Sequence, residues 1–170
     1  MDAYFRTRTD MPPHNPNVQV LRAVELFQGL APLIVSEIAR RASPVVYGAG
    51  ERLVCTGAWV QQAILIRSGQ AVIARGAGAV SGDVLPPGTL IHELGMFVEV
   101  ESGTTVIART QVSALAIRRD TMLSLIEEEP ALADYFNHKF AARLACIAAE
   151  LRRIDERLEP YSSSGSQYLS

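Results

Sequence analysis

The spacing of hydrophobic residues changes twice along the chain. From Val18 they recur at helical intervals, and Pro32 suits the first turn of a second helix over 33–42. Between Val45 and Arg119, short runs rich in β-branched residues alternate with Gly and Pro turns. Such runs, roughly ten residues apart, predict antiparallel strands in a sandwich or barrel. No stretch between them is long enough for the crossover helix of a parallel sheet.

Helical spacing returns at Asp120, a residue type that favours the helix N-cap. We predict a short helix from there to Pro130 and a long helix from Ala131 to about Glu159, ended by Pro160. The expected organisation is a flexible arm over 1–17, a β-rich domain with flanking helices over 18–130, a C-terminal helix over 131–159 and a flexible tail over 160–170.

The long helix carries an apolar stripe whose members are alternately three and four residues apart. The stripe consists of Leu144, Ile147, Leu151, Ile154 and Leu158. This is coiled-coil spacing and predicts a homodimer through the helix. The same stripe would also suit packing on the chain's own β-domain, and two phenylalanines, Phe136 and Phe140, extend it upstream.

Composition narrows the classes of function. The 170 residues are 48% hydrophobic and 20% charged, which is typical of one globular domain. The net charge of −2 argues against broad binding to nucleic acid. The N-terminal segment lacks the apolar core of a signal peptide, and no apolar run reaches the ~18 residues of a membrane span. We therefore expect a cytoplasmic protein without membrane contact.

The candidate chemical groups do not indicate catalysis. Cys55 and Cys146 belong to no metal or redox motif, and His14, His92 and His138 lack metal-ligand spacing. The Gly-rich segment 76–82 lacks the strand–loop–helix setting and the Lys of a phosphate loop. We expect no enzymatic activity, no cofactor and no metal.

Four segments, in this order, resemble the cyclic nucleotide-binding domain family. They are LRAVELFQGL (21–30), GERLVCTG (50–57), ILIRSGQAVI (64–73) and PPGTLIHELGMF (86–97). The resemblance covers roughly 18–158 and implies a mainly β fold: an eight-stranded jelly roll with N-terminal helices and a long C-terminal helix. In catabolite-activator-like regulators of this family, that helix is the dimer seam.

The resemblance also implies a ligand pocket at the family's phosphate-binding cassette. Glu93 matches the carboxylate that accepts a hydrogen bond from the ribose. Counting from Glu93, the position of the family's phosphate-binding Arg falls on Ser102, and His92 stands where the family has Gly. No Arg or Lys lies between Arg75 and Arg109. The candidate pocket residues are His92, Glu93, Leu94, Ser102, Gly103, Thr104 and Thr105.

These departures imply a regulatory module that does not bind cAMP or cGMP in the usual way and acts through contact with another protein. Because few residues follow the long helix, we expect no helix-turn-helix and no direct DNA binding. Two alternatives remain open. One is a receptor for another nucleotide, such as a cyclic dinucleotide, with cations supplied by Arg67, Arg75, Arg109 or Arg118. The other is a DNA-linked regulator that heterodimerises with a full-length relative through the helix.

Overall fold

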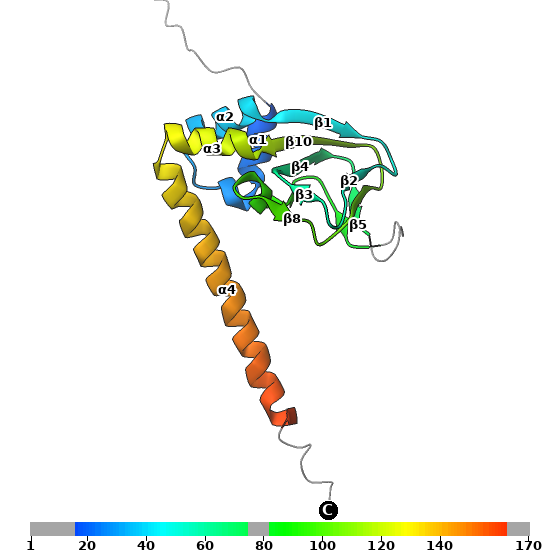
Figure 1. The fold of residues 1–170 in the computed structure, drawn as a ribbon, viewed down its shortest axis with the longest axis vertical. Helices are drawn as coiled ribbons and strands as arrows, with labels where there is room; N and C mark the ends of the chain where they lie inside the picture. Colours follow the sequence, from blue (N-terminus) through cyan, green and yellow to red (C-terminus); the bar gives the residue numbers. More distant parts are fainter. Residues whose placement is uncertain (1–15, 75–81, 163–170) are drawn as a thin grey trace, which may run out of the picture. The chain divides into compact units, whose positions relative to one another are not determined.

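The computed structural model of the chain describes residues 16–74 and 82–162, with side chains as far as Ile154. Most of the predicted arm and tail, Arg75 and the Leu158 side chain lie outside the described residues. The chain divides into two compact units, one ending at Leu125 and the other beginning at Ile126. Figure 1 shows the β-rich first unit and the long helix of the second.

The helices lie close to the predicted positions. They are α1 (Pro16–Ala23), the 3-10 helix η1 (Glu25–Phe27), α2 (Pro32–Arg41), α3 (Arg119–Glu128) and α4 (Ala131–Ser162). Proline occupies the first position of α1 and α2, where its missing N–H costs no helical hydrogen bond. α3 begins one residue before Asp120, so Asp120 lies in its first turn instead of capping it.

The predicted mainly β fold with flanking helices is confirmed. The strands are β1 (Ser43–Tyr47), β2 (Arg52–Val54), β3 (Trp59–Val60), β4 (Gln62–Ser68), β5 (Ala71–Ile73), β6 (Val84–Leu85), β7 (Leu90–Ile91), β8 (Val100–Glu101), β9 (Val106–Ala108) and β10 (Val112–Arg118). Eight of these correspond to the eight predicted runs. The other two, β3 and β8, are only two residues long and pair with each other.

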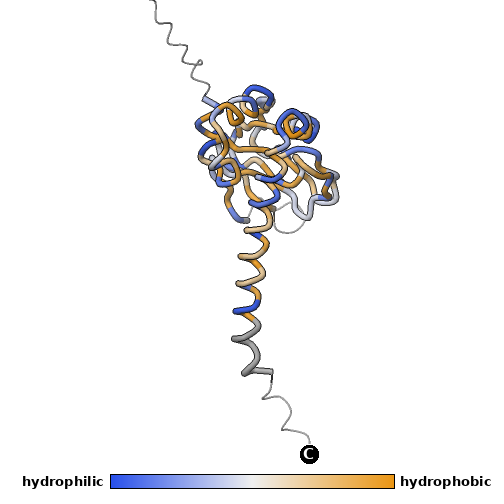
Figure 2. Tube along the Cα trace, turned by 90° about the vertical axis from the view of Figure 1, so that its left-hand side faces the viewer, coloured by the Kyte–Doolittle hydropathy of each residue, from blue (hydrophilic) through white to orange (hydrophobic). Residues whose placement is uncertain are grey.

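Two antiparallel four-stranded sheets form the roll, with strand orders β1-β10-β4-β7 and β2-β9-β5-β6. A common core contains residues of both sheets, including Val54 of β2, Ile64 and Ile66 of β4, and Val106 of β9. Leu65 is buried too, although strand alternation places it on the opposite face of β4. The central strands are therefore apolar on both faces. Figure 2 shows hydrophobic residues running through much of the first unit.

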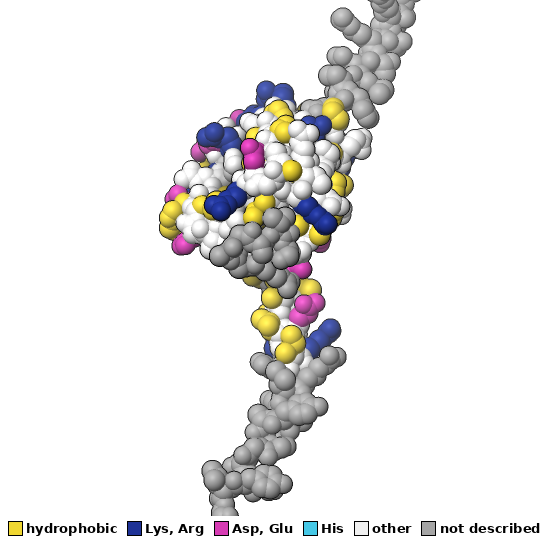
Figure 3. Space-filling view, turned by 90° about the vertical axis from the view of Figure 1, so that its right-hand side faces the viewer, with side chains coloured by type: hydrophobic (Ala, Val, Ile, Leu, Met, Phe, Trp, Pro, Cys, Tyr) yellow, Lys and Arg dark blue, Asp and Glu magenta, His cyan; other side chains and the backbone are white. Residues whose placement is uncertain are grey.

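The second unit is built on α4. Its helix continues to Ser162, three residues beyond the predicted end at Glu159. Pro160 lies in the last turn of α4, where few residues follow it, instead of ending the helix. Of the predicted stripe, Leu144, Ile147, Leu151 and Ile154 are 47–67% exposed. Figure 3 shows hydrophobic side chains gathered along this helix, next to charged ones.

Candidate functional site

The predicted cassette lies in unit 1, between β7 and β9. After β7 the chain turns at His92 into the 3-10 helix η2 (Glu93–Met96), and β8 follows. Gly95 is required here because a Cβ at this position would lie 2.8 Å from the carbonyl oxygen of Gln62, at the start of β4. The motif H-E-L-G-M therefore forms a tight turn pressed against the central sheet.

Ser102 is the centre of the hydrogen bonds in this cassette. Its side chain is only 1% exposed, and its hydroxyl donates to the carbonyl oxygen of Thr104 at 2.7 Å. The same oxygen lies 3.0 Å from Nε2 of His92 and accepts from the backbone N–H of Thr104 at 3.3 Å. A hydroxyl has one proton and two lone pairs, so all the hydrogen-bonding capacity of Ser102 is used within the protein.

His92 adopts a backbone conformation that glycine adopts more readily than any residue with a side chain. Its φ of 54° and ψ of 49° are left-handed, and it is the one non-glycine residue with positive φ in the described part of the chain. A left-handed side-chain-bearing residue costs about 1–2 kcal/mol. Because the Ser102 proton is directed to Thr104, Nε2 of His92 carries a hydrogen and donates it to Ser102. Burial lowers the pKa of His92 and favours its neutral form.

The backbone fixes the loop next to Ser102 to the turn before β3. The N–H of Gly57 donates to the carbonyl oxygen of Ser102 at 2.8 Å, and the N–H of Ser102 donates to Ala58 at 2.9 Å. One residue further on, Trp59 of β3 is opposite Glu101 of β8. These bonds hold Ser102 inside the fold, so its burial follows from strand pairing.

The structure only partly unites the other predicted pocket residues. Glu93 is half-buried at the start of η2, whereas Leu94 is exposed. Gly103 and Thr104 are exposed at the turn before β9. The hydroxyl of Thr105 accepts from the N–H of Thr56 and lies 3.0 Å from its hydroxyl, so it braces the loop after β2. Among the predicted pocket residues, the contact between the side chains of His92 and Ser102 is therefore the central one.

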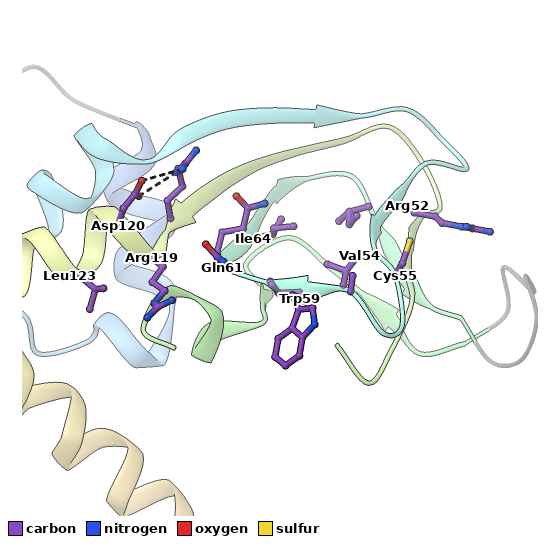
Figure 4. Close-up of a pocket in the computed structure, with 14 residues that line it drawn as sticks. Arg52, Val54, Cys55, Trp59, Gln61, Ile64, Arg119, Asp120 and Leu123 are labelled. Carbon is purple, nitrogen blue, oxygen red and sulfur yellow. Dashed lines mark hydrogen bonds and ion pairs between the residues drawn. The ribbon is translucent and has the colours of Figure 1, made fainter. Parts of the chain in front are cut away.

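A cavity of about 560 Å³ lies elsewhere in unit 1, and sequence reasoning missed it. Its walls are β2, β3, the start of β4 and the junction between β10 and α3 (Figure 4). None of the predicted cassette residues lines it, but Arg119 and Trp59 do. The adjacent arginines at 118 and 119 were the available signal, because they end the last predicted strand.

Among the described residues, the arginines considered for another nucleotide do not all line the cavity. Arg118 lines the cavity, but its guanidinium is ion-paired with Asp120 at 3.1 Å. Neither Arg67 nor Arg109 is a lining residue. Nε of Arg67 is buried without a hydrogen-bond partner among the described residues.

Among the described residues, no group of three His, Cys, Asp or Glu side chains is placed to hold a metal ion. In the same residues, no helix combines the length and apolar character needed to cross a membrane.

Comparison with known proteins identifies the fold's relatives. The chain is 26% identical over 146 residues to the "CRP-like cAMP-activated global transcriptional regulator" of two Mycobacterium tuberculosis strains. This match takes in 82% of the chain but only 61% of the relative's length.

Solved structures agree with this match. The N-terminal domain of a Streptomyces coelicolor transcriptional regulator superposes with a TM-score of 0.72 at 24% identity, covering 78% of this chain and 94% of that one. Thermus thermophilus catabolite activator protein gives a TM-score of 0.61 at 27% identity, covering 76% and 62%. A family model described as "Cyclic nucleotide-binding domain" matches residues 44–129, about half of the chain. The chain therefore belongs to the cyclic nucleotide-binding domain family.

Proposed function

We propose that the chain is a regulatory module whose phosphate subsite is filled by its own side chains, so that cAMP and cGMP are not bound in the usual way. The observation that carries the proposal is Ser102. It stands at the counted position of the family's Arg, is buried, and has its hydroxyl engaged by His92 and Thr104. A cyclic phosphate entering here would have to break these bonds and would find no fixed cation.

Electrostatics supports the same conclusion. Between Gly82 and Ala108 the chain has no Arg or Lys, whereas Glu93, Glu99 and Glu101 are acidic. Burial keeps the imidazole of His92 neutral, because it lowers the pKa. A charged hydrogen bond contributes about 1.5–3 kcal/mol, so losing the Arg alone weakens phosphate binding by roughly 10- to 150-fold.

Isothermal titration calorimetry with cAMP and cGMP tests this proposal. The natural protein should give no saturable heat at micromolar ligand. A His92→Gly/Ser102→Arg double variant removes the crowding ring and restores the cation, and it should bind cAMP. Adding Glu93→Ala to that variant should abolish the binding again, because the ribose partner is lost. Micromolar binding by the natural protein that disappears in Glu93→Ala would refute the closed subsite.

The proposed mode of action is contact between proteins through α4. Four stripe residues, Leu144, Ile147, Leu151 and Ile154, leave about half or more of their surface exposed. Fully burying such a side chain contributes about 1.5–3 kcal/mol, so pairing two copies would be favourable. A homodimer through this helix is therefore the first association we expect, and another protein could use the same face.

Multi-angle light scattering on the full chain tests the helix contact. Leu151→Asp places a charge in the stripe and should reduce the mass from that of a dimer to that of a monomer. Ala149→Asp is the matched control, because helical geometry places position 149 on the opposite face. A mass that is unaffected by Leu151→Asp, or equally affected by both changes, contradicts pairing through the stripe.

A further inference from the structure

The cavity beside β3 has the size and lining of a small-molecule site. Its volume of about 560 Å³ lies in the range of ligand pockets. Apolar side chains of β2 and β4, among them Val54 and Ile64, form part of its wall. Trp59 and Arg119 supply an aromatic ring and a cation. This combination of apolar wall, ring and charge is typical of sites for organic ligands.

The backbone explains why Trp59 and Arg119, which are far apart in sequence, come together. Arg118, the last residue of β10, is paired with Gln62 at the start of β4. The N–H of Arg119 then donates to the carbonyl oxygen of Gln61 at 2.9 Å. Trp59 is two residues before Gln61 on the same segment, so strand pairing places both side chains at one cavity.

The cavity is positively charged although the chain carries a net charge of −2. Its charged lining residues are Arg52, Arg118, Arg119 and Asp120. Asp120 compensates Arg118 at 3.1 Å. Figure 4 shows Arg52 extending away at the far end, while the side chains of Arg119 and Trp59 extend to the same side of the ribbon. Arg119 is therefore the cation that a ligand beside Trp59 would meet.

Arg119 also has a side-chain donor that lacks a hydrogen-bond partner among the described residues. This donor is its Nε atom, which is shielded from solvent. Buried donors without partners are rare in native proteins, and each calls for an explanation. A carboxylate or phosphate accepts from guanidinium N–H groups with favourable geometry.

Trp59 supplies the second contact. Its side chain is 66% exposed, and no ring or cation stacks on it within the part of the chain that the structure describes. An indole face is a good stacking surface for any flat ring. On the adjoining segment, the side-chain N–H of Gln61 donates to the carboxylate of Glu99 at 2.7 Å. That nearby negative charge disfavours polyanions and favours a ligand with one compact anionic group.

We propose that this cavity binds a small organic anion bearing a flat ring, with its carboxylate or phosphate on Arg119 and its ring on Trp59. The proposal is independent of the state of the cassette, since no cassette residue lines the cavity. Either anionic group can accept hydrogen bonds from the guanidinium of Arg119, so the test includes both.

Intrinsic fluorescence reads the site directly, because Trp59 is the single tryptophan of the chain. The probes are AMP, benzoate, adenosine as a ring without an anion, and inorganic phosphate as an anion without a ring. AMP or benzoate should quench Trp59 saturably, at least about tenfold more tightly than adenosine or phosphate.

Matched variants distinguish this site from surface charge and from the cassette. Arg119→Gln should weaken binding about tenfold or more, whereas Arg109→Gln, at an exposed arginine outside the cavity, should not. Arg119→Lys keeps the charge and serves if Arg119→Gln fails to fold. Glu93→Gln should leave the quenching unchanged. Absence of saturable quenching by either ring-bearing anion, equal effects at Arg119 and Arg109, or dependence on Glu93 would overturn the proposal.

Discussion

The Ser102 hydroxyl should stabilise the fold measurably, and Ser102→Ala removes it with little change in volume. Of its three hydrogen bonds, two are with the backbone of Thr104, an exposed residue whose groups can bind water instead. The third is with the half-buried ring of His92. With a net value near 1 kcal/mol for each bond not replaced, we expect a loss of about 1–2 kcal/mol in the free energy of unfolding.

Urea denaturation near neutral pH measures this loss. With an m-value of about 2 kcal/mol/M, the midpoint should fall by about 0.5–1 M. Ser113→Ala is the control, because Ser113 is half-buried in β10 and its hydroxyl has no hydrogen-bond partner among the described residues. Its effect should stay within about 0.5 kcal/mol.

A double-mutant cycle isolates the bond between Ser102 and His92. His92→Asn is suitable because asparagine tolerates the left-handed conformation but lacks the imidazole. The coupling energy with Ser102→Ala should be about 0.5–1.5 kcal/mol. If Ser102→Ala matches Ser113→Ala and the coupling is near zero, the hydroxyl is not part of a stabilising network and the reasoning is wrong.

Two other predictions concern the same loop. Since burial lowers the pKa of His92, the unfolded chain takes up the proton first as the pH falls. Stability should therefore be complete above the ordinary histidine pKa of about 6.5 and decrease as the pH falls through it toward the lower folded pKa. In urea midpoints, His92→Asn should reduce this decrease relative to the natural protein, and His138→Asn, at an exposed position, should not. Gly95→Ala would place a Cβ 2.8 Å from a carbonyl oxygen, so thermal melts should show a loss of about 1–3 kcal/mol. Gly103→Ala, whose Cβ would meet nothing within 4 Å, should be close to neutral, and equal effects of the two would contradict the geometry.

Much of the fold could be predicted from local pattern. Short runs rich in β-branched and apolar residues between Gly and Pro turns identified eight strands, although strands such as β4 and β10 bury nearly continuous runs of residues with no alternation. The short strands β3 and β8 escaped prediction, since two residues establish no period and the strands exist only through their mutual pairing. The end of α4 was displaced because the helix passes through Pro160 and ends at Ser162.

The candidate site was less predictable, because its chemistry depends on contacts distant in sequence. The sequence singled out His92 and Ser102 as two separate departures from the family pattern. Only the fold places Nε2 of His92 3.0 Å from the hydroxyl of Ser102. The cavity at Arg119 depends on an even longer connection, the pairing of β10 with β4, and no local motif encodes it.

The small size of β3 and β8 has a dynamic consequence. Their pairing, with the bonds from Gly57 and Ser102, helps to attach the cassette loop to the segment that carries Trp59. Segments with so few hydrogen bonds open locally at far lower free energy than the seven-residue strands β4 and β10. The amides of Gly57 and Ser102 should therefore exchange with deuterium together and early. An occupant on Trp59 would slow both, which makes amide exchange at the cassette a distant reporter of the cavity.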